Sequence, residues 1–350
     1  MSDRRPLPDA DGIHEIIRSR ITARQQDATT LRVAGPIATQ RWSRVFRGDG
    51  SAYPTPVAIK LCIDPATDAP AGNEARRGFE ALTQANELLG GAADCAAARA
   101  LDVVEEEGLI VAEWVDGPTL AARLLDHRLS NTDALRHAAW AGRWLATLHR
   151  KSALQDRPVD TDLLLGHIDD ATAGAKLDAV SESAVALLRQ SAANLHRSPV
   201  SRAASHGDCK AENFIVSGSR LVAVDIELRH EDAVTNDLAQ FLNHLRLLFF
   251  HPRGLYRLIR VGAFERAFLQ GYAENGGAIP AAALAWVRLQ NALRLSLRRH
   301  HWSGRGPAAR IGDWSFKHVV AGLTRELARA AAASQPPAAY RKRLAMPPAR

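Results

Sequence analysis

Residues 205–227, SHGDCKAENFIVSGSRLVAVDIE, carry most of the information about the fold. Two short apolar runs, 214–216 and 221–224, flank the turn residues Gly218-Ser219. Apolar runs on either side of a glycine-containing turn predict a β-hairpin. Such a hairpin brings the polar loop that precedes it close to Asp225, the carboxylate that follows it.

The polar side chains around this hairpin suit phosphoryl transfer. We expect Asp208, Asn213 and Asp225 to lie together, and Lys210 adds a positive charge beside them. Carboxylate and carboxamide oxygens are hard ligands of the kind that Mg²⁺ takes when it also shares substrate phosphates. Transfer of a γ-phosphoryl group needs mainly positioning, charge neutralisation and one carboxylate that orients the attacking hydroxyl and accepts its proton. The stretch therefore predicts the catalytic centre of a phosphotransferase, with Asp208 as that carboxylate.

These residues resemble the signature of the aminoglycoside phosphotransferase and choline kinase family, whose members are relatives of the protein kinases. The matching positions are His206-Gly207-Asp208, Lys210, Asn213 and Asp225. The resemblance implies ATP and Mg²⁺ as cofactors, Asp208 as the catalytic base beside Lys210, and Asn213 and Asp225 as the metal ligands. It also implies that His206 and Asp237 support the loop structurally.

The resemblance further implies an α+β, protein-kinase-like bilobal fold with a small β-rich N-lobe and a large, mainly helical C-lobe. It covers roughly residues 30–330 in the order of elements, but it is specific only at Lys60 and at His206 to Asp225. In place of the D-F-G of protein kinases the chain has Asp225-Ile226-Glu227, which the resembled small-molecule kinases tolerate.

Upstream, the run Val57-Ala58-Ile59-Lys60 matches the strand that supplies the phosphate-binding lysine of kinase-like proteins. The loop that covers the nucleotide should then be Gly35 to Ser43, between the first two strands, with Thr39 and Ser43 as hydroxyl donors. This loop has a single glycine instead of G-x-G-x-x-G, which disfavours a protein kinase more than it disfavours a kinase.

The segment Asn73 to Leu89 has helical periodicity and should carry an acidic partner for Lys60. Glu74 falls on the apolar face and is favoured by periodicity, whereas Glu80 remains the alternative because its F-E-A-L context resembles the family. After two further strands, the resemblance makes 113–117 the hinge, where backbone groups of residues such as Glu113 and Val115 bind the adenine edge.

The change from β-like to helix-rich sequence near residue 117 marks the predicted lobe boundary. We expect an N-terminal extension with one helix, an N-lobe, a helical C-lobe and a disordered tail. Their bounds are residues 1–30, 31–117, 118–333 and 334–350, respectively.

Composition excludes several classes of protein. The chain has 350 residues, of which 46% are hydrophobic, so it can bury a sizeable core. Apolar runs long enough for a membrane span or a signal peptide are missing, which predicts a cytoplasmic protein. The three cysteines are scattered and predict neither disulfides nor zinc. The net charge of +7 comes almost wholly from arginines without an aromatic-interleaved motif, so we expect no nucleic-acid partner.

The expected partner is a small-molecule hydroxyl acceptor. Between Arg246 and Arg310 the sequence has eleven arginines and two acids, which disfavours a polycationic antibiotic and favours an acceptor with a phosphate or carboxylate. His300, His301, Trp302 and Arg305 resemble a binding corner. A sugar or lipid-headgroup kinase of the same fold and a nucleotide-binding pseudokinase that acts as a regulatory scaffold are the alternatives. A pseudokinase is expected to have lost catalytic residues. This sequence keeps all four of them, Lys60, Asp208, Asn213 and Asp225, and so does not support that alternative.

Overall fold

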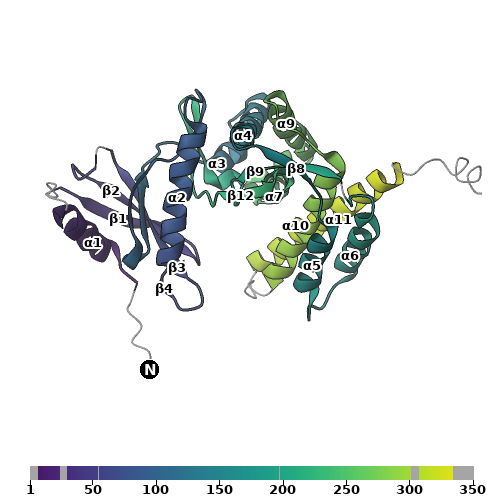
Figure 1. The fold of residues 1–350 in the computed structure, drawn as a ribbon, viewed down its shortest axis with the longest axis horizontal. Coiled ribbons are helices and arrows are strands. Elements are labelled where there is room, and N and C mark those ends of the chain that lie inside the picture. The colour runs from purple at the N-terminus through teal and green to yellow at the C-terminus, as the bar shows by residue number, and fades with distance from the viewer. Residues whose placement is uncertain (1–6, 24–29, 54, 197, 301–306, 334–350) are drawn as a thin grey trace, which may run out of the picture.

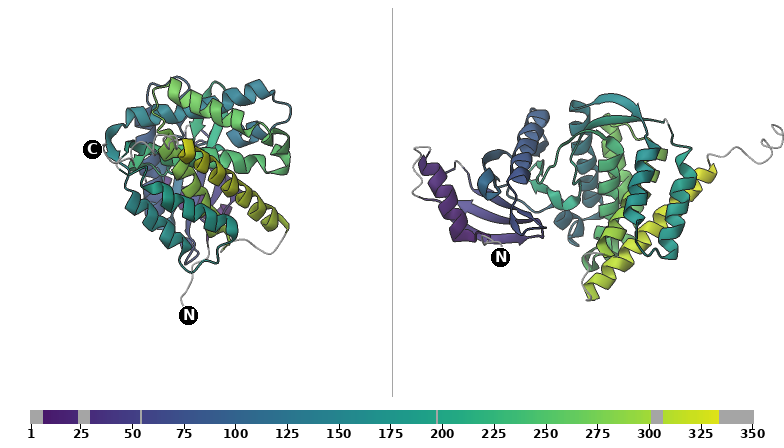
Figure 2. Two further views of the ribbon diagram at one scale, coloured as in Figure 1. Left: turned by 90° about the vertical axis from the view of Figure 1, so that its right-hand side faces the viewer. Right: turned by 60° about the horizontal axis from the view of Figure 1, so that its bottom comes forward.

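The protein consists of a β-rich N-terminal lobe and a larger, mainly helical C-terminal lobe, as its computed structural model shows in Figure 1 and, from two other sides, in Figure 2. The α+β bilobal fold predicted from the sequence is confirmed. The structure describes residues 7–23, 30–53, 55–196, 198–300 and 307–333. The predicted tail, 334–350, and the binding-corner residues His301, Trp302 and Arg305 lie outside the described residues, and the side chain of His300, the fourth residue of that corner, is not described either.

An antiparallel sheet with the strand order β1-β2-β3-β7-β6 forms the N-terminal lobe, and the short β4 pairs with β3. The 3₁₀ helix η1, Glu105–Glu107, makes the turn between β6 and β7. The strands are β1 Arg32–Thr39, β2 Ser43–Asp49, β3 Val57–Asp64, β4 Ala69–Pro70, β6 Ala100–Val104 and β7 Leu109–Glu113.

Two helices, α1 (Ala10–Ala23) and α2 (Gly72–Leu89), cover opposite faces of this sheet (Figure 1). Ile59 of β3 belongs to the buried cluster that contains the isoleucines of α1, whereas Cys62 belongs to the cluster that contains the alanines of α2. Side chains alternate along a strand. Lys60, two residues before Cys62, therefore lies on the face of the sheet that α2 covers.

The active-site hairpin is also attached to the N-terminal lobe. Its strands are β10 (Phe214–Ser217) and β11 (Arg220–Ala223), and β11 pairs in parallel with β5 (Cys95–Ala97), the strand that follows α2. The hairpin itself is confirmed. In the linker between the lobes, Gly117 has φ 139°, and a Cβ there would lie 2.2 Å from the carbonyl oxygen of Val216. Glycine thus allows the linker to lie directly against the hairpin.

The C-terminal lobe contains helices packed around a hydrophobic core and a three-stranded sheet of order β12-β9-β8. In this lobe the α-helices are α3 Leu120–Leu125, α4 Asn131–Lys151, α5 Thr161–Thr172, α6 Ala179–Ala192, α7 Val234–Phe249, α8 Leu255–Leu258, α9 Val261–Glu274, α10 Ala281–His300 and α11 Pro307–Ala333. Its other elements are the strands β8 Leu154–Pro158, β9 Pro199–Ser205 and β12 Arg229–Ala233 and the 3₁₀ helices η2 Ala211–Asn213 and η3 Pro252–Gly254.

The prediction that Gly35 to Ser43 form a loop over the nucleotide is wrong, because most of this segment is a strand. Most of it is the second half of β1, which continues to Thr39, and only 40–42 form the turn into β2. Ala34 pairs with Arg47 and Ala38 with Val45, so two extra residues bulge out of β1 between these pairs. The glycine and proline in this bulge make the sequence look like a loop although the strand resumes beyond it.

The C-terminal lobe also differs from the sequence-based expectation. The segment 171–195 holds the end of α5 and the whole of α6, separated by a turn in which Gly174 has φ 69°. Asp178 caps α6 by accepting a hydrogen bond from the N–H of Ser181 at 3.0 Å. The strands β8, β9 and β12 were not predicted. β8 is exposed along its length, and such a strand lacks the apolar alternation by which strands are recognised.

All three cysteines, Cys62, Cys95 and Cys209, are buried and free. Within the described ranges, no helix is long and apolar enough to cross a membrane.

Candidate active site

The predicted catalytic loop, residues 206–210, follows β9 and is hydrogen-bonded to α7. Asp237, in the first turn of α7, is buried and accepts hydrogen bonds from the backbone N–H groups of His206 (2.6 Å) and Gly207 (3.0 Å) and from Nε2 of His149 (3.1 Å). Burial opposes the charge of this carboxylate, but the hydrogen bond and the electrostatic interaction with His149, together with those of His206, hold the pKa of Asp237 below its ordinary value. The predicted support acid therefore contacts the loop directly.

One turn further along α7, Gln240 fixes the loop at two more points. Its side-chain oxygen accepts from the N–H of Cys209 at 2.9 Å, and its side-chain nitrogen donates to the carbonyl of Gly207 at 2.9 Å. The sequence analysis missed Gln240. Its spacing of three residues from Asp237 on a helix, which puts both side chains on one face, is the signal that could have found it.

Gly207 occupies a place in the loop that only glycine fits. Its φ is 85°, and a Cβ there would lie 2.7 Å from the Cβ of Glu227. The segment containing Glu227 returns past the loop, and the N–H of Glu227 donates to the carbonyl of His206 at 2.9 Å. The two halves of the site are thereby in direct contact.

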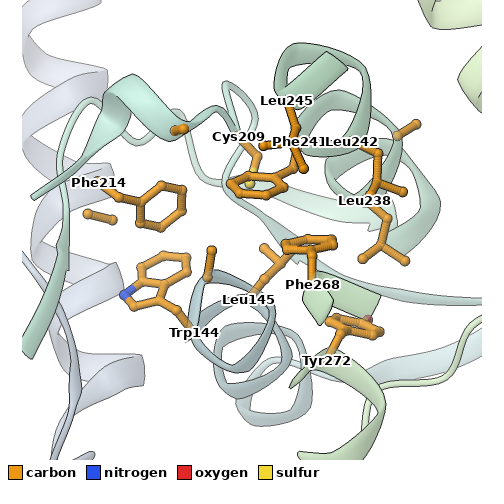
Figure 3. Packing of buried hydrophobic residues seen from close by; sticks show 14 of the residues in the cluster. Trp144, Leu145, Cys209, Phe214, Leu238, Phe241, Leu242, Leu245, Phe268 and Tyr272 are labelled. Carbon is orange, nitrogen blue, oxygen red and sulfur yellow. The ribbon is translucent and has the colours of Figure 1, made fainter. Parts of the chain in front are cut away.

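A buried aromatic cluster supports the loop. The ring of His206 lies 5.8 Å from that of Trp144 and 5.4 Å from that of Phe214, measured between centroids. Burial lowers the pKa of His206, and neither ring nitrogen has a hydrogen-bond partner among the described residues, so the ring is a neutral packing group. Figure 3 shows Trp144 and Phe214 in this cluster, with Cys209 near Phe241. Burial raises the pKa of Cys209 well above its ordinary value, which makes it a filler and not a nucleophile.

Asp208 is half-buried, and one of its carboxylate oxygens has two hydrogen-bond donors. Its Oδ2 accepts from Nζ of Lys210 at 2.5 Å and from Nδ2 of Asn213 at 2.9 Å. Burial raises the pKa of Asp208, but the charge of Lys210 and these two hydrogen bonds outweigh burial and leave the pKa below its ordinary value. Asp208 is therefore ionised at neutral pH. Among the described residues no hydrogen bond engages its Oδ1, which can accept from a hydroxyl.

Asn213 and Asp225 lie side by side because of the hairpin register. Phe214 pairs with Ala223, and the N–H of Val224 donates to the carbonyl of Asn213 at 2.8 Å. Asp225 follows in the left-handed region at φ 56°, and non-glycine residues held there often mark functional sites. Its carboxylate forms an ion pair with Nζ of Lys60 from β3. The structure thus brings together Lys60, Asp208, Lys210, Asn213 and Asp225.

Neither predicted partner of Lys60 on α2 is paired with it here. Glu74 forms an ion pair with Arg77, and Glu80 lies 3.6 Å from Arg76; both glutamates are exposed. Glu74 falls on the same side of α2 as the buried Ala81 and Ala85, as the periodicity predicts, but it is exposed in the first turn of the helix. Burial raises the pKa of the Cys62 thiol; Lys60 opposes this rise, and Asp225 and then Glu74 add to it, so Glu74 acts electrostatically on the face of β3 that carries Lys60.

The predicted hinge and hydroxyl donors lie at the ends of strands. Glu113 ends β7, and its N–H donates to the carbonyl of Arg99 at 2.9 Å; Val115 is half-buried in the linker. Thr39 ends β1 and is exposed, whereas Ser43 begins β2 and is buried. The carbonyl of Ser43 closes the turn by accepting from the N–H of Gln40 at 2.8 Å.

The residues at the hairpin suit a magnesium–nucleotide complex more than a protein-only metal site. Asn213 uses its Nδ2 on Asp208, which turns its carboxamide oxygen away from that carboxylate. In the described part of the chain, no three His, Cys, Asp or Glu side chains are arranged to hold a metal ion. Mg²⁺ commonly takes only one or two carboxylates and completes its shell with phosphates and waters. Asn213 and Asp225 fit that role.

A cavity of about 460 Å³ lies in the C-terminal lobe on the Gly207 side of the catalytic loop. Residues of α5, α7, α10 and all three strands of the β12-β9-β8 sheet line it, and Asp237 and Gln240 form part of its wall. Its volume is typical of sites for small molecules. Because the catalytic loop forms one wall, a molecule in this cavity would lie next to that loop.

No family model and no curated protein matches the sequence. Solved structures do resemble it: a putative aminoglycoside phosphotransferase from Ralstonia eutropha JMP134 has a TM-score of 0.59 and 13% identity, covering 92% of this chain and 98% of that chain. Choline kinase LicA from Streptococcus pneumoniae has a TM-score of 0.55 and 18% identity, covering 89% of this chain and 99% of that chain. A choline/ethanolamine kinase family protein from Mesorhizobium loti has a TM-score of 0.53 and 17% identity, covering 92% of this chain and 95% of that chain. The protein has a kinase-like fold.

At these identities the likeness concerns the kinase-like fold, and the activity must be argued from the site. In this kinase-like fold the sheet supplies Lys60, the hairpin supplies Asn213 and Asp225, and the loop between β9 and η2 supplies Asp208. These residues come from both lobes. The fold therefore places the candidate site at the junction of the two lobes.

Proposed function

We propose that the protein is an ATP- and magnesium-dependent phosphotransferase that moves the γ-phosphoryl group to a hydroxyl of a small molecule. The observation that carries this proposal is the ion pair between Lys60 and Asp225. It joins the sheet to the hairpin, beside the hydrogen-bonded group of Asp208, Lys210 and Asn213. A lysine, a carboxylate with one oxygen left to accept a hydrogen bond, and two side chains suited to bind a metal are the parts that phosphoryl transfer requires.

In this mechanism Asp208 orients the acceptor. Its Oδ1 accepts a hydrogen bond from the acceptor hydroxyl, whose oxygen forms a bond to the γ-phosphorus while the bond from that phosphorus to the β,γ-bridging oxygen breaks. The hydroxyl proton passes to Asp208, and ADP leaves with the bonding electrons. Lys210 and Asn213 hold Oδ2 and so fix the carboxylate plane. The low pKa of Asp208 keeps it ionised to accept this proton as the hydroxyl acidifies in the transition state.

The remaining residues bind the donor. Asn213 and Asp225 would hold Mg²⁺, which when bound neutralises the charge of the phosphates. Lys60 would contact the phosphates, with Glu74 as its acidic partner in preference to Glu80, because Glu74 acts on neighbouring Cys62. Binding of the nucleotide then requires the ion pair between Lys60 and Asp225 to break, because Lys60 would contact the phosphates and Asp225 would contact Mg²⁺.

We assign the other nucleotide contacts to the backbone of the linker and to the first turn of the sheet. The backbone of Glu113 and Val115 would bind the adenine edge, and the hydroxyls of Thr39 and Ser43 would lie near the phosphates. The N–H of Glu113 already donates to Arg99, so its carbonyl and the backbone of Val115 are the groups proposed for the base.

Acceptor-dependent release of ADP tests the proposal. The purified chain is incubated with ATP and Mg²⁺ against a library of hydroxyl compounds that includes sugars, lipid headgroups and aminoglycosides, with EDTA in a parallel series. The proposal expects one compound class to stimulate ADP release and EDTA to abolish it. Nucleotide binding without turnover of any acceptor would favour the pseudokinase scaffold, and turnover insensitive to EDTA would contradict the assigned metal role.

A further inference from the structure

The carboxylates and the arginines that line the cavity beside the catalytic loop differ in how many hydrogen-bond and ion-pair partners they have. Its carboxylates are engaged: Asp160 accepts from the N–H of Leu163 at 2.9 Å, and Glu231 pairs with Arg157 at 3.1 Å. Asp232 accepts from the N–H of Ala233 and from the side chain of Asn236, at 2.8 and 2.6 Å. Asp237, the fourth, holds the catalytic loop. Each of these carboxylates therefore accepts at least one hydrogen bond from the protein.

The arginines of the same cavity are less well compensated. Arg294, on α10, is half-buried and has no hydrogen-bond or ion-pair partner among the residues that the structure describes. Arg202, on β9, donates only to a neutral group, the carbonyl of Glu231, at 3.2 Å. Two guanidinium groups thus line the cavity without a carboxylate partner from the described part of the chain.

Arg294 is under electrostatic stress in the free protein. Burial, followed by the positive charges of Arg298 and Arg229, lowers the pKa of Arg294 more than the exposed carboxylate of Asp170 raises it. A partly buried charge without a partner is costly, and an anion bound against it would offset that cost. The side chain is therefore better suited to a ligand than to the stability of the fold.

The rest of the wall suits an organic skeleton. Leu164 of α5 and Val287 of α10 provide apolar surface, and Gln290 and Asn291, beside Arg294 on α10, provide amide groups. Gly207 of the catalytic loop forms another part of the wall. A ligand with an anionic end and a hydroxyl-bearing carbon skeleton matches these three kinds of surface.

We propose that this cavity is the acceptor site and that it takes hydroxyl compounds carrying a carboxylate or phosphate, whose anionic group lies against Arg294 with Arg202 as a second donor. The proposal rests on the proposed phosphotransferase function and names its class of substrate. Of the arginines between Arg246 and the end of α10 whose side chains the structure describes, Arg294 alone lines the cavity. Arg246 and Arg288 instead form ion pairs with Glu265.

Equilibrium binding, measured by calorimetry, tests the subsite without requiring turnover. The ligands are gluconate and glucose 6-phosphate, which separate a carboxylate from a phosphate, with neutral glucose and cationic glucosamine for comparison. Each is titrated into the full chain without nucleotide and with ADP and Mg²⁺, so that anion binding at the nucleotide phosphate site is recognised. At least one anion should bind more tightly than glucose and glucosamine.

The variants are Arg294→Ala, Arg294→Lys and, as a matched control, Arg266→Ala, an exposed arginine on α9. Loss of a charge-assisted pair should weaken anion binding about 10- to 100-fold in Arg294→Ala, and lysine should restore part of it because it keeps the charge but not the bidentate geometry. Arg266→Ala should leave binding unchanged. The thermal midpoint of Arg294→Ala should not fall, since the removed charge has no partner; a preserved midpoint also shows that the variant is folded.

Binding and turnover separate failure of the subsite from failure of the proposed function. Arg294-dependent anion binding without ADP release supports the subsite and contradicts the phosphotransferase. ADP release with glucose or glucosamine as the preferred acceptor, undiminished in Arg294→Ala, supports the phosphotransferase and overturns the subsite. The absence of Arg294-dependent anion binding at millimolar concentrations also overturns it.

Discussion

Replacing Asp237 with asparagine tests how firmly α7 holds the catalytic loop. Oδ2 of Asp237 accepts from His206 N–H (2.6 Å) and His149 Nε2 (3.1 Å), and Oδ1 accepts from Gly207 N–H (3.0 Å). Asparagine keeps the shape and one acceptor oxygen. Its amide group must then face at least one of these buried donors.

The magnitude follows from this geometry. One buried N–H without an acceptor costs about 1–3 kcal/mol, and loss of the negative charge weakens the remaining hydrogen bonds by about 1 kcal/mol more. We expect Asp237→Asn to lower the free energy of unfolding by about 2–4 kcal/mol at pH 7, measured by urea denaturation. The matched control is Asp170→Asn, the same change at an exposed position of α5, which should stay within about 0.5 kcal/mol of the wild type.

The effect should depend on pH with a defined sign. Because the folded-state pKa of Asp237 is lowered, its stabilisation is fully present above the ordinary aspartate pKa of about 3.9 and is lost as the pH falls through the folded-state pKa. The difference between wild type and Asp237→Asn should therefore be complete at pH 7 and shrink below about pH 4. A difference under about 0.5 kcal/mol at pH 7 would refute the view that this carboxylate holds the loop.

Three further predictions concern the site. Asp225→Ala should abolish turnover and weaken magnesium-dependent nucleotide binding with the fold intact by circular dichroism; wild-type nucleotide binding that ignores EDTA would contradict the metal role. Lys60→Ala should lower kcat/KM for ATP by about 10- to 100-fold, and of Glu74→Gln and Glu80→Gln only one, Glu74→Gln, should reproduce much of this loss; if neither does, the acidic partner is misassigned. Gln240→Ala frees two backbone contacts of the loop and should lower kcat by at least about tenfold with little change in nucleotide affinity, whereas an unchanged kcat would show that Asp237 alone suffices.

The active-site hairpin was predictable because its information is local. Two apolar runs and a Gly-Ser turn specify the hairpin, and its register then places Asn213 beside Asp225. The lysine strand was predictable for the same reason, since Val57 to Lys60 alternates as a half-buried strand should. The resemblance to a known family supplied the roles, which spacing alone does not specify.

Other features depend on contacts between distant residues. Gln240 is an unremarkable helical glutamine until α7 packs under the catalytic loop, and the strands β8 and β12 are charged segments that pair only because β9 lies between them. The ion pair of Lys60 with Asp225 joins residues 165 positions apart. The sequence could not distinguish Arg294 from the arginines around it. What distinguishes Arg294 is that it has no hydrogen-bond or ion-pair partner among the described residues, and this depends on the folded structure.

Asp208→Asn is the most direct test of the central claim. The substitution keeps the shape of the side chain and removes the group that accepts the hydroxyl proton, while Lys60, Asn213 and Asp225 remain to bind the nucleotide. With an acceptor in hand, phosphorylation by the variant should fall by about 10²- to 10⁴-fold while its affinity for ATP with Mg²⁺ stays near that of the wild type. Phosphorylation at the wild-type rate would remove Asp208 from the mechanism and contradict the account.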